Sequence, residues 1–119
     1  MLFLEYSKCS TSNKAKKWLK DNNIEVDKRS IKDKNPTFEE LKLWYEKSGF
    51  DIKRFFNTGG KLYREQGIKD LFKTATITEL LNILSVDGMM VKRPILISDD
   101  FILIGFKEEL WESTILKTN

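Results

Sequence analysis

The stretch LFLEYSKCSTSNKAKKWLK, residues 2–20, decides the fold of this 119-residue chain. Residues 2–6 are a mostly apolar run that is too short for a helix and is bounded by polar residues, which predicts a short, largely buried strand. Between Ser12 and Asn22 the apolar residues fall at helical spacing and lysines fill the other face, which predicts an amphipathic surface helix. A weaker candidate strand follows at residues 25–29, so the order strand, helix, strand predicts a right-handed βαβ unit with a parallel pair.

Two capping boxes predict that the middle of the chain is helical. Thr37 and Thr76 are each followed, three residues on, by a glutamate, and in such a pair the hydroxyl and the carboxylate accept from backbone N–H groups that the helix leaves free. The segment Asn57-Thr58-Gly59-Gly60 predicts a turn. We expect helical stretches at residues 37–47, 52–56, 61–72 and 76–86, with the last one stopped by Asp87-Gly88.

An antiparallel hairpin is predicted near the C-terminal end. Residues 94–97 and 101–104 are two apolar, β-branched runs separated by a short polar segment. Gly105 ends the second run, and residues 107–116 close the chain as a helix with apolar residues on one side. Four strands with helices between and after them predict an α/β chain with one mixed sheet covered on both faces, in a single domain over residues 1–119.

The composition excludes several kinds of chemistry. The chain has no histidine, so imidazole serves neither as a base nor as a zinc ligand, and its single cysteine cannot form an internal disulfide. The formal net charge of +3 is too small and too scattered to indicate direct nucleic-acid binding. No apolar run is long enough for a signal peptide or a membrane span, so we expect a cytoplasmic protein that does not bind membranes. We also expect no metal site and no permanently bound cofactor.

Cys9 lies between the first predicted strand and the first predicted helix. The free N–H groups and the positive end of the helix dipole converge there, and such a position lowers the pKa of a cysteine. Lys8 and Lys14 add positive charge nearby, and Ser12, in the sequence C-x-x-S, lies one helical turn on and can donate to a thiolate. A lone cysteine is more often a small buried apolar residue. The polar neighbours of Cys9 argue against burial, which leaves the two interpretations about even.

The order of several short motifs gives the chain a resemblance to a known family. The motifs are the cysteine loop of residues 8–15, the segment of residues 55–63, Arg93-Pro94-Ile95, and residues 105–109. In this order and separation they resemble the arsenate reductase and Spx-like family, including its YffB-like thiol reductases. The resemblance covers essentially the whole chain. It implies a thioredoxin-like fold, a four-stranded mixed sheet flanked by helices with a helical insertion in the middle of the chain.

The resemblance also implies roles for individual residues. In similar proteins the cysteine matching Cys9 is the redox nucleophile, and the proline matching Pro94 is cis and lies beside it. Arg93 would bring a permanently charged, planar donor to the thiolate or to a bound anion. Without the resemblance, Pro94 would be an ordinary trans residue at a strand start and Arg93 a solvated surface residue. The catalytic set is Cys9, Ser12 and Arg93, and the expected contacts to glutathione or another anion are Lys8, Thr11, Pro94 and Lys107.

The sequence departs from true arsenate reductases, which hold the oxyanion with several arginines. A rough alignment places Asn57 and Phe106 where two further arginines would fall, so that only Arg93 remains. Lys107 and Arg64 are the residues that could substitute in space. We therefore expect arsenate to be a poor substrate.

Two functions of different classes follow from the resemblance. The leading one is a monothiol thiol–disulfide oxidoreductase in which Cys9 attacks a disulfide or oxidised sulfur and glutathione or glutaredoxin resolves the mixed disulfide. The alternative is a non-enzymatic, Spx-like regulator that binds RNA polymerase, although Spx-type proteins typically carry C-x-x-C and this chain has Ser12 instead. The lysine-rich face of the first helix is the candidate surface for an acidic partner. The alternative interpretation is that this face is simply exposed to solvent.

Overall fold

The computed structural model describes residues 1–116 of the chain. These residues form two compact units, one made of residues 1–29 together with the segment from Arg93 onward, the other of residues 30–92. The first unit carries the β-sheet and the second is mainly helical. The single domain expected over residues 1–119 stays a prediction.

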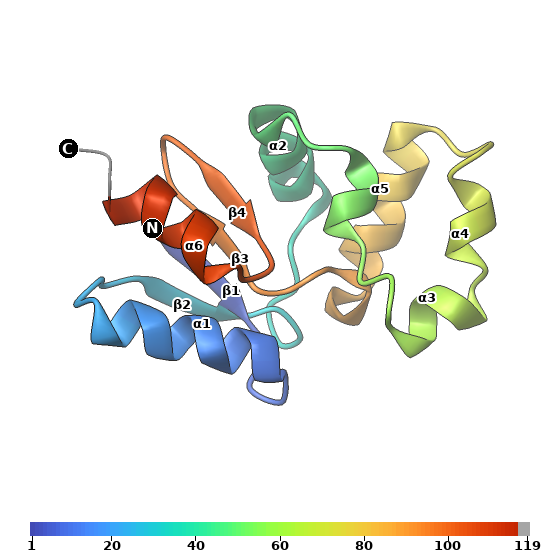
Figure 1. Ribbon diagram of the computed structural model, residues 1–119. Helices are drawn as coiled ribbons and strands as arrows, with labels where there is room; N and C mark the ends of the chain where they lie inside the picture. Colours follow the sequence, from blue (N-terminus) through green and yellow to red (C-terminus); the bar gives the residue numbers. More distant parts are fainter. Residues whose placement is uncertain (117–119) are drawn as a thin grey trace. The chain divides into compact units, whose positions relative to one another are not determined.

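The first unit is built on a four-stranded sheet with the strand order β2-β1-β3-β4 (Figure 1). Strand β3 pairs antiparallel with β1, where Phe3 lies opposite Leu96, and antiparallel with β4, where Leu96 lies opposite Leu103. The sheet is mixed, and the predicted α/β fold and C-terminal hairpin are confirmed. The strands are β1 (Leu2–Glu5), β2 (Asp27–Ser30), β3 (Ile95–Ile97) and β4 (Ile102–Ile104).

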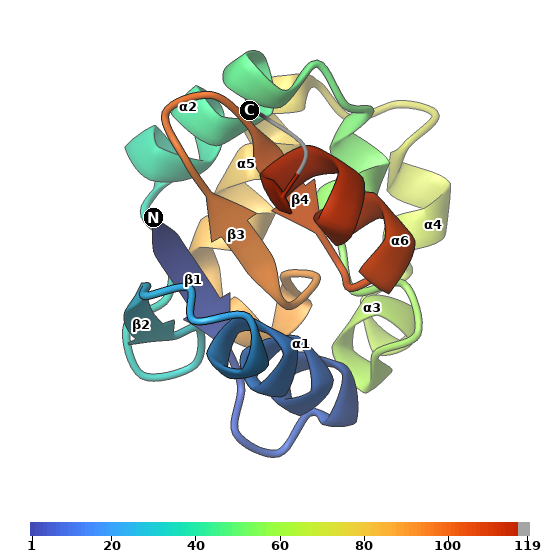
Figure 2. The ribbon, with the colours of Figure 1, turned by 60° about the vertical axis from the view of Figure 1, so that its left-hand side comes forward.

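Two helical segments pack against this sheet. Helix α1 (Ser10–Asp21) begins two residues earlier than predicted, because Cys9, with an extended backbone (φ −99°, ψ 119°), is its N-cap. Helix α6 (Glu108–Trp111) continues into a π-helical segment, Glu112–Leu116, where the sequence predicted one regular helix. Figure 2 shows α1 and α6 on the same face of the sheet, and the buried residues they share with the strands form one apolar cluster.

The apolar cluster of the first unit is organised around Trp111. Its ring makes edge-on contacts with Phe3, Trp18 and Phe106 at centroid distances of 6.5, 5.9 and 5.0 Å. The indole N–H donates to the carbonyl of Gly105 at 3.2 Å, so the polar end of this 1% exposed side chain is paired. The buried members of the cluster are Phe3, Ala15, Trp18, Leu19, Leu96, Leu103 and Trp111.

In the second unit, two helices begin at the threonine caps that the sequence predicts. Thr37 and Thr76 each accept from the backbone N–H of the glutamate three residues on, whose carboxylate accepts from the threonine's own N–H, so both predicted capping boxes are confirmed. The predicted helical stretch of residues 61–72 is divided in two, because Gly67 adopts a left-handed conformation (φ 61°) between its halves. The helical elements are α2 (Phe38–Ser48), η1 (Ile52–Phe55), α3 (Lys61–Glu65), α4 (Ile68–Leu71), α5 (Ile77–Val86) and η2 (Gly88–Met90).

Gly88 lies where two backbone segments meet. The sequence predicted that Asp87-Gly88 stops the helix, and α5 does end at Val86 with Asp87 as its C-cap. Gly88 itself does not have a positive φ. A β-carbon at this position would collide with the backbone carbonyl of Ile31, so the glycine permits a close approach of two backbone segments. Within residues 1–116, no helix has the length and apolar character needed to cross a membrane.

Candidate redox site

The turn between β1 and α1 fixes the position of Cys9. Its backbone N–H donates to the carbonyl of Tyr6 at 2.9 Å, and its carbonyl accepts from the N–H of Asn13 at 3.1 Å. The side-chain amide of Asn13 also donates to the carbonyl of Ser7 at 3.0 Å, which ties the loop to the first turn of the helix. The Cys9 side chain is therefore held, partly exposed, at the N-terminal end of α1.

Hydrogen bonds to the sulfur favour the thiolate of Cys9. Burial raises the pKa of the thiol, but hydrogen bonds outweigh it, so the pKa of Cys9 lies below its ordinary value. The donors are the N–H and hydroxyl of Ser12, the N–H of Thr11 and the side chain of Arg93. The two backbone donors belong to the first turn of α1, whose N–H groups have no partner within the helix. The sequence suggested that Lys8 and Lys14 would favour the thiolate, but neither lysine is among the groups that lower the pKa of Cys9.

Ser12 lies at the centre of this arrangement. Its side chain is fully buried, and its oxygen accepts a hydrogen bond from the N–H of Tyr6 at 3.3 Å. Because a hydroxyl has one donor and two acceptor positions, that bond leaves its proton available for the sulfur of Cys9. The structure thus brings together the two residues of the C-x-x-S sequence, with a bond to the backbone that sequence reasoning did not foresee.

Arg93 and Pro94 come to the same place from the other end of the chain. The peptide bond between them is cis, as the resemblance implies. The carbonyl of Pro94 accepts from the N–H of Gly105 at 2.8 Å, which connects the start of the hairpin to its end. The guanidinium carbon of Arg93 lies 5.0 Å from the centre of the Tyr6 ring. Arg93 is therefore a partly buried neighbour of Cys9 and not the solvated residue of the alternative interpretation.

The other predicted contact residues lie in different settings. Thr11 acts on Cys9 through its backbone N–H. Lys8 is exposed in the turn, and Lys107 is exposed at the N-cap of α6; neither is among the groups that shift the pKa of Cys9. Phe106 packs against Trp18 and Trp111, so it is a partly buried residue at the edge of the apolar cluster of the first unit. Asn57 and Arg64 belong to the second unit.

Sequence reasoning missed Tyr6, which contacts every member of the proposed catalytic set. Its carbonyl binds the N–H of Cys9, its N–H binds the hydroxyl of Ser12, and its ring lies against Arg93. The available signal is its position at the end of the first predicted strand, three residues before the cysteine. A tyrosine in such a place is ordinarily assigned to the strand alone.

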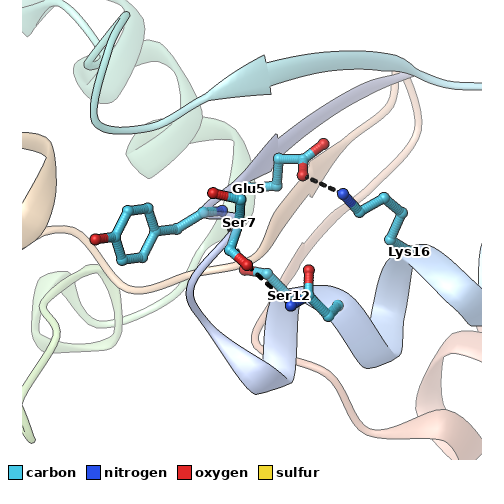
Figure 3. Close-up of polar contacts among 6 residues, drawn as sticks. Glu5, Ser7, Ser12 and Lys16 are labelled. Carbon is cyan, nitrogen blue, oxygen red and sulfur yellow. Dashed lines mark hydrogen bonds and ion pairs between the residues drawn. The ribbon is translucent and has the colours of Figure 1, made fainter.

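An ion pair between a buried carboxylate and a partly exposed lysine adjoins the site. The carboxylate of Glu5 is bound by the ammonium group of Lys16 at 2.7 Å, and Figure 3 shows the two side chains pointing toward one another from β1 and α1. Glu5 is only 8% exposed, so Lys16 neutralises a carboxylate that would otherwise lack a charged partner. Lys16 is thus engaged with the sheet, and the lysine face of α1 consists of Lys14, Lys17 and Lys20, which are exposed.

These features define the class of protein. The mixed sheet of this order gives a thioredoxin-like α/β fold, with a partly exposed cysteine at the N-terminal end of α1 and a cis-proline directly before β3. The model of the ArsC family matches residues 4–114, and the chain belongs to this family. The resemblance to the arsenate reductase and Spx-like proteins is confirmed.

Three relatives describe the range of similarity. The chain is 43% identical over 112 residues to the "Uncharacterized protein YusI" of Bacillus subtilis (strain 168), covering 94% of this chain and 95% of that protein. The crystal structure of a putative ArsC family related protein from Bacteroides fragilis superposes with a TM-score of 0.90 at 49% identity, covering 94% of each chain. The global transcriptional regulator Spx 2 of Bacillus anthracis is 25% identical over 101 residues, covering 85% of this chain and 76% of that protein.

Proposed function

We propose that the protein is a monothiol thiol–disulfide oxidoreductase with Cys9 as its nucleophile. The observation that carries the proposal is the partly exposed Cys9 thiol, whose pKa is lowered by hydrogen bonds from Ser12, Thr11 and Arg93. The thiolate is the reactive form of cysteine, and low-pKa, accessible cysteines at helix N-termini are typical of disulfide chemistry. Membership of the ArsC family supports a thiol reductase of this general kind.

The proposed reaction has two exchanges. The Cys9 thiolate attacks the glutathione sulfur of a mixed disulfide RS–SG, a bond forms between Cys9 and glutathione, and RS⁻ leaves and takes a proton from solvent. A second glutathione, as thiolate, then attacks the glutathione sulfur of the adduct, which releases oxidised glutathione and restores the Cys9 thiolate. The net change is reduction of RS–SG by one glutathione.

The chain's own residues have distinct tasks in these exchanges. Ser12 and Arg93 stabilise Cys9 as the attacking anion in the first step and as the leaving group in the second, because a leaving thiolate of lower pKa departs faster. Ser12 cannot form a disulfide, so resolution requires an external thiol, which makes glutathione or glutaredoxin the proposed reductant. Lys8, Thr11, Pro94 and Lys107 are the proposed contacts to its peptide backbone and carboxylates.

Arsenate is not the proposed substrate. Holding a doubly charged oxyanion against a thiolate takes several charged donors, and Asn57 and Phe106 stand at two positions where similar enzymes carry arginines. Each charge-assisted hydrogen bond contributes about 1.5 to 3 kcal/mol, so two missing bonds imply a deficit of about 3 to 6 kcal/mol. That deficit corresponds to about a hundredfold to ten-thousandfold in rate. Efficient arsenate reduction that disappears in Lys107→Ala would show that a lysine had replaced the arginines.

Mass spectrometry combined with kinetics tests the proposal. The protein is equilibrated with oxidised glutathione, and we expect one glutathione adduct on the wild type and none on Cys9→Ser. Reduced glutathione should then remove the adduct, and a small glutathione mixed disulfide should be reduced catalytically, with ping-pong kinetics. Absence of the adduct, or an adduct that glutathione leaves in place, would contradict the proposal.

A second candidate function is a non-enzymatic regulator that binds RNA polymerase. The relationship to a protein named global transcriptional regulator Spx 2 favours it, and the exposed lysines Lys14, Lys17 and Lys20 offer a surface for an acidic partner. The distinguishing experiment is a pull-down with purified RNA polymerase, using wild type and Lys17→Glu. Retention of the polymerase by the wild type and its loss in the variant, without catalytic turnover of mixed disulfides, would favour this function. Both functions fit the cytoplasmic location that the sequence predicts.

A further inference from the structure

We propose that the ring of Tyr6 is a positioning element of the site: it holds the guanidinium of Arg93 against the sulfur of Cys9. The inference rests on the proposed function of Cys9 as a thiolate nucleophile. Tyr6 follows the last residue of β1, Glu5, and precedes the turn that leads to Cys9. The inference gives its side chain a role in the site. Tyr6 acts through Arg93 and not on the substrate itself.

Tyr6 contacts the site in two separable ways. Its backbone carbonyl and N–H bind Cys9 and Ser12, and these bonds form whatever side chain residue 6 carries. Its ring makes a different contact, with the Arg93 guanidinium carbon 5.0 Å from the ring centre. Substitutions at this position therefore change the Arg93 contact and leave the hydrogen bonds of the turn in place.

The ring contact has a direct electrostatic reason. The face of an aromatic ring carries partial negative charge, and a guanidinium within about 6 Å of the centroid is attracted to it. Arginine has a long side chain with many rotamers, so each contact that restricts Arg93 raises the fraction of time it spends beside the sulfur. Contact with Tyr6 restricts that freedom and keeps the charged donor beside Cys9.

The consequence is a specific effect on the thiolate. Arg93 is one of the donors that lower the pKa of Cys9, so loss of the ring should weaken that donor and raise the pKa toward the ordinary value. Phenylalanine keeps the ring and leucine removes it. A contribution from ring packing alone would instead appear in the free energy of unfolding and leave the titration of Cys9 unchanged.

The first experiment compares the pH dependence of Cys9 alkylation in wild type, Tyr6→Phe and Tyr6→Leu. The Cys9 titration is also followed by thiolate absorbance, which does not depend on turnover. We expect Tyr6→Phe to titrate like the wild type and Tyr6→Leu to titrate at higher pH. Below the midpoint, Tyr6→Leu should be alkylated about two- to fivefold more slowly, the loss that corresponds to one cation–π contact.

The second experiment tests whether the effect passes through Arg93. In an Arg93→Gln background, Tyr6→Leu should produce no further shift of the titration, because the donor that the ring positions is already gone. A second, equal shift in that background would overturn the proposal. Should Tyr6→Leu fail to fold, pentafluorophenylalanine at position 6 keeps the shape of a phenylalanine ring and reverses the charge of its face, and we expect it to titrate as Leu would.

The outcomes separate this inference from the proposed function. A wild-type Cys9 that titrates like a free thiol would contradict the proposed function itself. A wild-type Cys9 with lowered pKa that is equally lowered in Tyr6→Leu, or in the pentafluorophenylalanine variant, would overturn only the role of Tyr6. The expected pattern, wild type and Phe alike with Leu shifted upward, supports both.

Discussion

The helical unit of residues 30–92 starts two of its helices at threonine caps that bind residues three positions away, whereas the sheet unit builds its site from both ends of the chain. Cys9 and Ser12 come from the start of the sequence, and Arg93 comes from the segment that leads into β3. Local bonds are sufficient to define the first kind of structure. The second kind exists only when the sheet has formed, which is why its chemistry depends on long-range packing.

Removal of the Trp111 side chain is expected to have the largest effect of the substitutions considered, a loss of stability in the sheet unit. Trp111→Ala deletes the ring that contacts Phe3, Trp18 and Phe106, and large-to-small changes of buried aromatic residues cost about 3 to 5 kcal/mol. Urea unfolding monitored by circular dichroism measures the loss. Leu110→Ala, at the exposed neighbouring position, is the control and should change the free energy of unfolding by about 0.5 kcal/mol or less. Equal effects of the two substitutions would show that the aromatic cluster does not stabilise the sheet unit.

Ser12→Ala should have an intermediate effect, and it should act on both stability and chemistry. The N–H of Tyr6 loses its partner in a partly buried hydrogen bond, and a fully buried donor left unsatisfied costs about 1 to 3 kcal/mol, so we expect a loss toward the lower end of that range. The pKa of Cys9 should rise as well, because the hydroxyl donor to the sulfur is lost. Ser10→Ala, at the exposed first residue of α1, is the matched control, and it should leave the alkylation profile of Cys9 unchanged. A pKa of Cys9 that is the same in Ser12→Ala as in the wild type would exclude the hydroxyl as a donor.

Thr76→Ala should have a smaller effect that is confined to stability. It removes the capping box of α5, and loss of such a cap costs about 1 kcal/mol. The exposed Thr78→Ala in the same helix has no capping bond to lose and serves as the control. Because the Thr76 bonds are local to the helical unit, the pH dependence of Cys9 alkylation should match the wild type. A shifted alkylation profile in Thr76→Ala would break the contrast between locally capped helices and a distantly assembled site.

The same contrast explains what the sequence could predict. The capping boxes, the hairpin and the cysteine at the start of the first helix were predicted, because each depends on residues that are close in sequence. The start of α1 was placed two residues late, since Cys9 caps the helix through its backbone conformation and no side-chain cap marks it. The sequence did not predict the different structural roles of Gly67 and Gly88. Gly67 has a left-handed backbone, and Gly88 lies against the carbonyl of Ile31.

Within the site, too, the contact between residues close in sequence was predicted and the contact of Tyr6 with a residue distant in sequence was missed. The proximity of Ser12 to Cys9 follows from helical spacing, and Arg93 was known only through the resemblance. The contact of Tyr6 with Arg93 had no signal in the sequence, because it joins the end of β1 to the segment before β3. Conversely, Lys8 and Lys14 were close in sequence to Cys9 and yet extend into solvent.

The smallest expected effect is the dependence of stability on the ionisation of Cys9. Because the pKa of Cys9 is lower in the folded protein than in the unfolded chain, the unfolded chain binds more protons between the two pKa values. Folding should therefore become more favourable as the pH rises through that interval. The stabilisation is complete above the unfolded pKa, about 8.5, and is lost as the pH falls through the folded pKa.

The measurement is the difference in free energy of unfolding between wild type and Cys9→Ser, both kept reduced, from about pH 6 to about pH 9.5. All other titrating groups are common to the two proteins, so the slope of this difference reports Cys9 alone. We expect the difference to grow in favour of the wild type with increasing pH, by a small amount because the thiol is partly exposed and solvent screens its charge. A difference that stays flat would mean that folding leaves the pKa of Cys9 unchanged, and one that falls would mean that burial outweighs the donors from Ser12, Thr11 and Arg93. Either result would mean that the groups which the sheet unit brings together around Cys9 do not stabilise its thiolate in the folded protein.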